Sequence, residues 1–386
     1  MKETIGCIFF LWSMSINTVA QLAKSNRIIQ IVFTSDAHYG IKRPEFRGKV
    51  NVEASIVNEK MIEKINTITA IQLPKDSGIN AGKKIDGIDY LIQGGDITNR
   101  MEIPFQNAAV SWTQFEKDYI NGITLKDRHG NLEKLLLIPG NHDATNAVGF
   151  YKPMNPVKDP TSMVEMYNLM MKPVAAINNN NFDYLRDKIN YSKNIGGIHF
   201  LFLQIWPDSL ERIWMENDLQ TIPLNTPVII FTHDQPESEA KHFSNPIPCR
   251  GINAEDKFEE LLSEQYKEGD KVNAHDGVTV LEQHGWVNFL KLHPNIKAYF
   301  HGNSNYNEYY VYKGPDADIA LNTFRVDSPM KGKNSLKDET KLSFQLITID
   351  TKSGLMTVRE CLWNTDPLNP EKPVKWGDCK TVSLKK

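Results

Sequence analysis

Five short runs of β-branched and aliphatic residues, each ending abruptly on Asp, His or Asn, constrain the fold of this chain more than any other feature. They lie in residues 27–40, 89–100, 134–143, 227–234 and 295–314. Continuous apolar runs of this length are typical of strands buried on both faces of a sheet. Their polar ends then fall at the carboxyl ends of strands, where α/β proteins gather their ligands.

Segments with helical spacing separate these runs. In residues 50–69, Val52, Ile56 and Met61 recur at near-helical spacing, which predicts an amphipathic helix. The other predicted helices begin at capping residues or proline, or have an amphipathic pattern. They are residues 104–120, 159–171, 208–219 and 254–266. Strands that alternate with helices predict an α/β or layered α-β-α architecture.

Two later segments break the alternation and predict β-hairpins. Residues 189–206 would turn at 194–197, and residues 341–363 would turn at 352–354, where Gly and polar residues interrupt the apolar pattern. Both hairpins are expected to extend a central β-structure with antiparallel strands.

The chain has no internal repeat and no long linker, so residues 27–366 are interpreted as one domain. Pro and Lys become frequent near residue 367, and residues 367–386 are interpreted as a C-terminal tail. A disulfide between Cys361 and Cys379 would pin this tail to the body. Free, buried thiols are the alternative, and Cys249 would remain unpaired in either case.

The N-terminus follows the pattern of a signal peptide. Lys2 precedes an apolar run over residues 5–12, and polar residues then lead to Ala20, so residues 1–20 are predicted to be cleaved. A buried first helix is the alternative, and the run is shorter than the ~20 residues of a membrane span. The mature chain is therefore expected to be exported, either periplasmic or extracellular, and to contain no membrane span.

The charge balance excludes one broad class of function. A formal net charge of -3 gives no overall attraction to nucleic acid or to an anionic membrane. No specific nucleic-acid binding is indicated, and any phosphate-binding function has to be local.

The strand ends carry oxygen and imidazole ligands but no thiolates. They are Asp36, His38, Asp96, Asn141, His142, Asp143 and His233. Such a set suits Mn, Fe, Zn or a similar divalent ion rather than a structural zinc site. Each motif is common by chance when taken alone, but the ordered set predicts a functional site.

With these residues in order, the sequence resembles the calcineurin-like metallophosphoesterase superfamily, which includes purple acid phosphatases, Ser/Thr protein phosphatases and nucleotide phosphodiesterases. The matching motifs are DAH at 36–38, GDITNR at 95–100, GNHD at 140–143 and THD at 232–234. The resemblance implies a four-layer α/β/β/α sandwich of mixed sheets. It also implies a dinuclear metal site at the strand ends, and it identifies residues 27–366 as the catalytic domain.

The resemblance assigns the metal ligands position by position. Asp36 and His38 would bind the first ion, Asp96 would bridge both ions, and Asn141 and His233 would bind the second. The expected cofactors are two divalent ions drawn from Mn, Fe, Zn and Mg. Such a pair activates a bridging water and neutralises phosphoryl oxygens.

The same resemblance assigns the catalytic and substrate-binding residues. His142, oriented by Asp143, would act as general acid or transition-state stabiliser, and Asn141 would help to steady the developing charge. Arg100 matches a phosphate-contacting arginine, with a surface arginine as an equal alternative. His242 is a candidate substrate contact, although a solvent-exposed histidine is the favoured alternative.

The last family motif departs from its pattern. Where the family has G-H-x-H, this chain has Gly302 followed by Asn303 and Asn305, so each ion would lose an imidazole. The asparagines could bind through their carbonyl oxygens, which favours Mg, Mn or Ca over Zn. Alternatively His301 could supply one imidazole, although neighbouring strand residues point to opposite faces. The third alternative is a weak or empty site.

The main hypothesis is therefore an exported, metal-dependent phosphoesterase that hydrolyses phosphate mono- or diesters with a metal-bound hydroxide. Its substrate would be a small-molecule or macromolecular phosphoester. The alternative is a secreted, non-catalytic or weakly active binding protein on the same fold, with a metal site degraded at Asn303 and Asn305.

Overall fold

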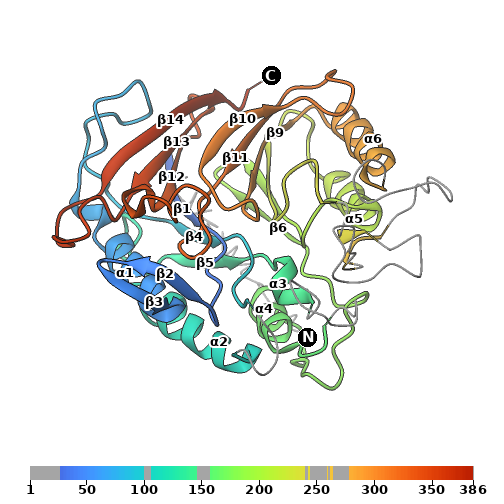
Figure 1. Cartoon of the computed structure of the whole chain (residues 1–386). Coiled ribbons are helices and arrows are strands. Elements are labelled where there is room, and N and C mark those ends of the chain that lie inside the picture. Colours follow the sequence, from blue (N-terminus) through green and yellow to red (C-terminus); the bar gives the residue numbers. More distant parts are fainter. Residues whose placement is uncertain are drawn as a thin grey trace, which may run out of the picture.

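The computed structural model describes residues 27–99, 106–145, 157–239, 242–243, 259, 261–263 and 278–385. Two six-stranded sheets form the centre of this part, and helices lie on their outer sides (Figure 1). The predicted α/β/β/α sandwich of mixed sheets is confirmed. None of the described helices has the length and apolar character needed to cross a membrane.

The first sheet has the strand order β14-β13-β12-β1-β4-β5. Its strands are β1 (Ile28–Thr34), β4 (Tyr90–Gln93), β5 (Lys134–Leu137), β12 (Ser343–Asp350), β13 (Leu355–Leu362) and β14 (Lys375–Ser383). β1, β4 and β5 run parallel, whereas β12, β13 and β14 are added antiparallel. The loops that follow β1, β4 and β5 therefore meet at one edge of the sheet.

The second sheet has the order β10-β11-β9-β8-β7-β6. Its strands are β6 (Tyr191–Ile195), β7 (Ile198–Phe202), β8 (Val228–Phe231), β9 (Ile296–His301), β10 (Glu308–Tyr312) and β11 (Leu321–Arg325). The inner strands β7, β8, β9 and β11 are parallel, and the edge strands β6 and β10 are antiparallel. The loops after β8, β9 and β11 consequently share one edge as well.

Helices cover the outer side of each sheet. The described α-helices are α1 (Ala54–Asn66), α2 (Ala108–Phe115), α4 (Thr161–Met171), α5 (Ser209–Leu219) and α6 (Val278–Leu292), together with the short α3 (Asn141–Ala144), which follows β5 at the edge of the first sheet. α1, α2 and α4 lie beside the first sheet, and α5 and α6 beside the second (Figure 1). The side chain of Asp208, a predicted cap, accepts backbone N–H groups at the start of α5. Asn107 caps the start of α2 in the same way, three residues after the predicted start at Pro104.

Shorter elements complete the chain. They are the strands β2 (Lys42–Phe46) and β3 (Lys49–Glu53), the 3₁₀ turns Ile68–Ala70 and Glu339–Lys341, and the π-helical turn Glu116–Ile120. β2 and β3 pair with each other as a separate ribbon.

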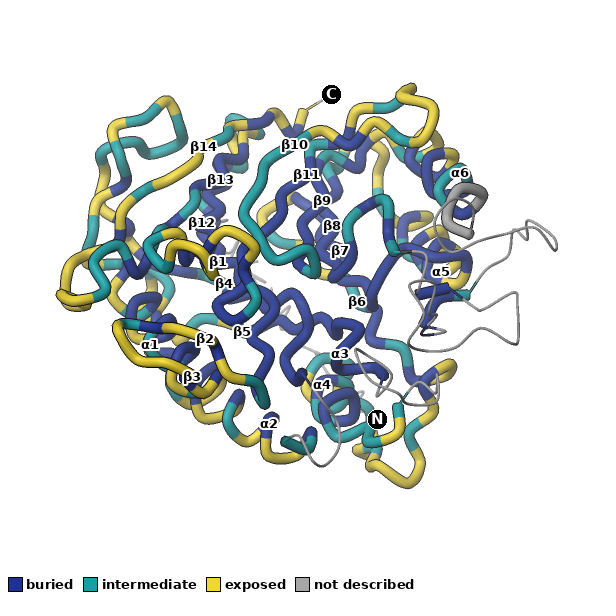
Figure 2. Tube along the Cα trace, viewed as in Figure 1, coloured by how far each residue is buried: buried dark blue, intermediate teal, exposed yellow. Residues whose placement is uncertain are grey.

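An aromatic cluster joins the two sheets. The ring of Phe33 on β1 lies 5.3 Å from that of Phe231 on β8 and 5.8 Å from that of Phe300 on β9, all fully buried. Burying each such side chain is worth about 1.5–3 kcal/mol. Buried residues run along the central strands of both sheets (Figure 2). Because these three residues lie near the carboxyl ends of their strands, the two ligand-bearing edges are held together.

The predicted strands and hairpins are confirmed. The five apolar runs contain β1, β4, β5, β8 and β9, and both hairpins, β6–β7 and β12–β13, form antiparallel pairs. The helix predicted over residues 254–266 is wrong where the structure describes it, since residues 261–263 are not helical. Leu262 instead forms an isolated bridge with Phe243.

The C-terminal segment also differs from expectation. Within residues 367–386, which were predicted to form a tail, β14 pairs with β13 and extends the first sheet. Cys361 and Cys379 lie on these neighbouring strands as free thiols, one buried and one exposed, so no disulfide joins them. Cys249 lies outside the described residues.

Candidate metal centre

The backbone at the edge of the first sheet is bent sharply. Asp36, His38 and Asp96 all have positive φ values, of 57°, 45° and 53°, which few residues other than glycine adopt. The N–H of Asp36 donates to Gly95 O at 2.9 Å, and that of His38 donates to Asp96 O at 2.9 Å. These bonds lock the loops after β1 and β4 together, and such strain is concentrated at functional sites.

Two glycines allow the loops to approach this closely. A Cβ on Gly140 would lie 2.2 Å from Asp96 Oδ1, and one on Gly302 would lie 2.3 Å from Asp36 Oδ2. Both distances are far shorter than a real contact, so any side chain would displace a carboxylate. The glycines of the GNHD and HGNSN segments are therefore needed for close packing.

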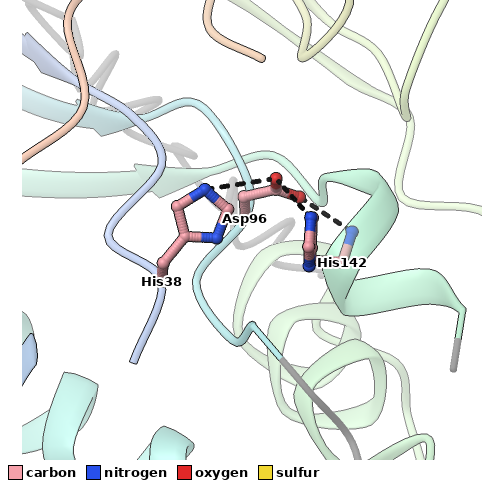
Figure 3. Close-up of side chains that lie close together, drawn as sticks. All are labelled: His38, Asp96 and His142. Carbon is pink, nitrogen blue, oxygen red and sulfur yellow. Dashed lines mark hydrogen bonds and ion pairs between the residues drawn. The ribbon is translucent and has the colours of Figure 1, made fainter. Parts of the chain in front are cut away.

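Asp96 lies at the centre of a cluster of buried side chains (Figure 3). Its Oδ1 is 3.3 Å from His233 Nε2, and its Oδ2 is 3.6 Å from His38 Nε2 and 3.9 Å from His142 Nε2. Possible ligand atoms form two groups, each within 4.8 Å: His38, Asp96 and His142, and Asp36, Asp96 and His233. Asp96 belongs to both groups, as a bridging carboxylate must.

The atoms that face this cluster fit a metal ion. Asp36 Oδ1 and His38 Nε2 are buried without a hydrogen-bond partner among the described residues, although burying such atoms without a partner costs free energy. His233 Nδ1 lies 2.8 Å from Gly94 O, so this nitrogen carries the proton and Nε2 is available as a ligand. Asn141 Nδ2 donates to Glu259, which turns its Oδ1 to within 3.3 Å of His233 Nε2.

The ionisation of the imidazoles is strongly perturbed. Burial lowers the pKa of His38 to about 3, helped by the charge of Lys331. Burial also acts to lower the pKa of His233, but the neighbouring Asp96 carboxylate outweighs it and raises the pKa to about 10. His38 is thus a neutral ligand, whereas His233 has to lose a proton before it can bind an ion.

His142 is held differently from the prediction. Its Nδ1 lies 2.7 Å from the carbonyl oxygen of Asn99, and its backbone N–H donates to Asp96 Oδ1. Asp143, which was predicted to orient the ring, instead accepts the N–H groups of Thr98 and Gly140. Burial, together with the charge of Asp96, raises the pKa of Asp143 to about 6. Asp143 therefore supports the surrounding backbone, and Asn99 orients the imidazole.

His242 is buried rather than solvent-exposed. Its side chain has no exposed surface, and Nδ1 lies 2.6 Å from Asp234 Oδ2. Nε2 lies 3.8 Å from Glu259, which in turn accepts from Asn141. His242 therefore supports the wall behind Asn141, and the structure does not place it as a substrate contact.

The two asparagines behave differently. Asn303 Nδ2 donates to Asp234 at 3.0 Å and to Glu239 at 3.1 Å, and its backbone N–H donates to Asp36 Oδ2. Asn305 Nδ2 donates to the carbonyl oxygen of Asn303, while its Oδ1 is buried and has no partner in the part of the chain that the structure describes. The amide nitrogen of Asn303 is thus engaged with carboxylates, whereas Asn305 has a buried amide oxygen that accepts no hydrogen bond from the described residues.

His301 lies outside both ligand groups. Its Nε2 is 3.0 Å from the hydroxyl of Tyr310 and its Nδ1 is 3.0 Å from Gly302 O. Burial, together with the charge of Arg325, lowers its pKa well below the usual value. Arg100, the predicted phosphate contact, lies outside the described residues.

Sequence reasoning missed Lys331, whose Nζ lies 3.1 Å from His142 Nε2. It follows β11, a strand that was not predicted because polar residues interrupt it. Applying the strand-end rule to Leu321–Arg325 would have directed attention to this loop.

Residues 29–327 match the model of the calcineurin-like phosphoesterase family. The match covers most of the chain, so the chain belongs to this family. A search of the curated proteins found no match.

Among solved structures, a dimetal phosphatase from Danio rerio aligns with 86% of this chain and 95% of its own, at 9% identity and a TM-score of 0.47. Vps29 of Entamoeba histolytica in complex with zinc aligns with 92% and 100%, at 9% identity and a TM-score of 0.33. Phosphopantetheinyl hydrolase of Mycobacterium tuberculosis aligns with 78% and 90%, at 10% identity and a TM-score of 0.33. Similarity this distant carries nothing about the substrate.

Family membership and the buried donor cluster together support a phosphoester hydrolase that binds divalent metal. The ligand groups contain five residues, which come from the loops after β1, β4, β5 and β8.

Proposed function

We propose that this protein hydrolyses phosphate mono- or diesters at a centre of two divalent ions, held between the edges of its two sheets. The observation that carries the proposal is the arrangement around Asp96, whose two oxygens face imidazoles from both sheets: His233 on one side, His38 and His142 on the other. A carboxylate placed in this way suits two ions better than one.

The candidate ligands divide around this bridge. His38 and Asp96 would hold one ion, and Asp96, Asn141 and His233 would hold the other. Asp36 belongs to the group of His233, and its Oδ1 also lies 3.6 Å from His38 Nε2. Bound divalent ions would supply a water activated at neutral pH and would neutralise phosphoryl oxygens. The buried, thiolate-free donors suit Mn, Fe, Zn or Mg.

The side chains of the site would contribute orientation and proton control. With its Nδ1 proton donated to Asn99, His142 presents Nε2 beside Asp96, where it could contact the reacting group and, once Nε2 has taken up a second proton, pass that proton to the leaving oxygen. The hydrogen bond from His142 Nδ1 to the carbonyl oxygen of Asn99 fixes the orientation of the imidazole, so Nε2 faces the site.

The test is reconstitution of the purified protein with each of these metals, followed by assays on aryl phosphate monoesters and diesters. We expect metal-dependent hydrolysis that Asp96→Asn abolishes. The matched control is Asp316→Asn, because Asp316 is 64% exposed and follows β10, far from the ligand-bearing edge. The proposal fails if no metal supports hydrolysis, or if Asp96→Asn retains the activity of Asp316→Asn.

We propose further that the enzyme acts after export, in the periplasm or outside the cell. The support is the sequence of residues 1–20, with Lys2, the apolar run over residues 5–12 and Ala20. N-terminal sequencing of the protein recovered from the native cells should begin at Gln21. A chain that begins at Met1 would contradict this.

A further inference from the structure

Lys331 projects a positive charge into the candidate centre from a loop that no family motif includes. Its Nζ lies 3.1 Å from His142 Nε2, on the side of the ring opposite the bond from Nδ1 to Asn99. Because Asn99 already orients the imidazole, Lys331 is not required for that purpose. Lys331 therefore adds positive charge beside the ring rather than orientation.

The loop that carries Lys331 is held firmly. Ser328 Oγ donates to Asp36 O at 2.9 Å and accepts the N–H groups of Met330 and Lys331 at 3.1 and 2.9 Å. Arg43 on β2 donates to the carbonyl oxygens of Pro329, at 2.8 Å, and Ser335. The loop is thus tied directly to the metal-ligand strand end, and the position of the ammonium group is set by the fold.

Two lysines of this loop, Lys331 and Lys333, differ in where their side chains lie. Lys331 is half-buried and reaches His142, whereas the exposed Lys333, two residues later, lies with its Nζ 4.8 Å from the centre of the Tyr306 ring. The two side chains have the same chemistry and share one loop. Only the first lies at the candidate centre.

We propose that Lys331 binds a non-bridging oxygen of the phosphoryl group and makes the site prefer phosphate monoesters to diesters. The proposal rests on the hydrolase function proposed above. A monoester carries about two negative charges near neutral pH, because its second pKa is about 6, while a diester carries one. A fixed ammonium group therefore attracts the monoester more strongly, and a charge-assisted hydrogen bond of this kind is directional as well.

The experiment compares Lys331→Met, Lys331→Arg and the control Lys333→Met in the metal-loaded full chain. Lys331→Met keeps the apolar stem, and we expect it to lower kcat/KM for an aryl phosphate monoester by about 10- to 100-fold. For the matching diester we expect a loss of less than about threefold. Lys331→Arg should restore much of the monoester activity, and Lys333→Met should match the wild type.

Binding of inorganic phosphate, measured by calorimetry, separates this proposal from the proposed function. We expect Lys331→Met to weaken phosphate binding by about tenfold or more, with metal content unchanged. Equal phosphate binding by Lys331→Met and Lys333→Met would overturn the role of Lys331, even in an active enzyme. Equal losses on monoester and diester would overturn the preference. A wild type that hydrolyses neither ester, but binds phosphate through Lys331, would overturn the hydrolase function alone.

Discussion

The edges of the two sheets contribute unlike chemistry to the same centre. The first sheet presents Asp36, His38 and Asp96, all of which are buried. Asp36 Oδ1 and His38 Nε2 have no hydrogen-bond partner among the described residues. The second sheet presents His233, but next to it Asn303 donates its amide to carboxylates. The first edge therefore offers several candidate metal ligands. The second edge offers His233, beside an asparagine whose amide group is bonded to neighbouring carboxylates.

This contrast bears on the two missing histidines. If both asparagines were simple replacements for imidazole, their oxygens would face the ligand cluster in the same manner. Instead Asn303 is bonded to Asp234 and Glu239, and Asn305 has a buried oxygen without a partner. The amide nitrogen of Asn303 is therefore committed to neighbouring carboxylates, whereas Asn305 offers a buried oxygen that is open to a ligand role.

The largest effect is expected from the first edge. His38→Ala removes a neutral imidazole from a ligand group, and we expect metal affinity to fall at least about a hundredfold, with hydrolysis lost in parallel. Metal content after dialysis and the rate on an aryl phosphate measure both changes. The matched control is His284→Ala, because His284 is 38% exposed and pairs with Asp316 on the surface. Unchanged metal content in His38→Ala would show that His38 is not a ligand.

The second prediction concerns the proton on His233. Its pKa is raised to about 10 in the metal-free protein, so an ion must displace one proton at any lower pH. The proton stabilises the metal-free fold fully below about pH 6.5, and this contribution is lost as the pH rises through about 10.

Binding of the ion should therefore release one proton. Metal affinity should consequently rise about tenfold per pH unit between about pH 7 and about pH 9. Chelator competition at several pH values measures the slope, and calorimetry in buffers of different ionisation enthalpy counts the protons. An affinity independent of pH would show that His233 is not a ligand.

The third prediction separates the two asparagines. Asn305→His should tighten metal binding by about tenfold, since it restores an imidazole where a buried oxygen lacks a partner. Asn303→His should not tighten it, because the present side chain is directed at Asp234 and Glu239. Both positions have positive φ, 59° and 61°, which histidine tolerates better than most residues. Equal tightening at both positions would contradict the contrast between them.

The first edge could be predicted from sequence because its residues lie within a few positions of a strand end. DAH and GNHD directly follow β1 and β5, which are parallel strands of one sheet, so Asp36, His38 and His142 reach the same edge of that sheet. The fold class followed from the same runs. Long-range packing was not needed to identify them.

The second edge could not be predicted in this way. The orientation of Asn303 depends on Asp234 and Glu239, which belong to a different loop. His142 is oriented by the backbone carbonyl group of Asn99, and any residue type at position 99 would supply such a group, so the sequence does not indicate it. Lys331 follows a strand whose pattern is too short and too polar to recognise. Each of these features depends on how distant loops pack.

The smallest expected effect tests whether His301 could substitute for a missing ligand. In Tyr310→Phe, Nε2 of His301 loses its hydroxyl partner at 3.0 Å, and we expect the free energy of unfolding to fall by about 0.5–1.5 kcal/mol. Metal affinity should stay unchanged, because His301 lies outside both ligand groups. Denaturant unfolding and chelator competition measure the two quantities. Tyr312→Phe is the matched control, since the Tyr312 hydroxyl has no hydrogen-bond partner among the residues that the structure describes. Tighter metal binding in Tyr310→Phe alone would mean that the released imidazole reaches the ions, and the second edge would then hold a reserve ligand.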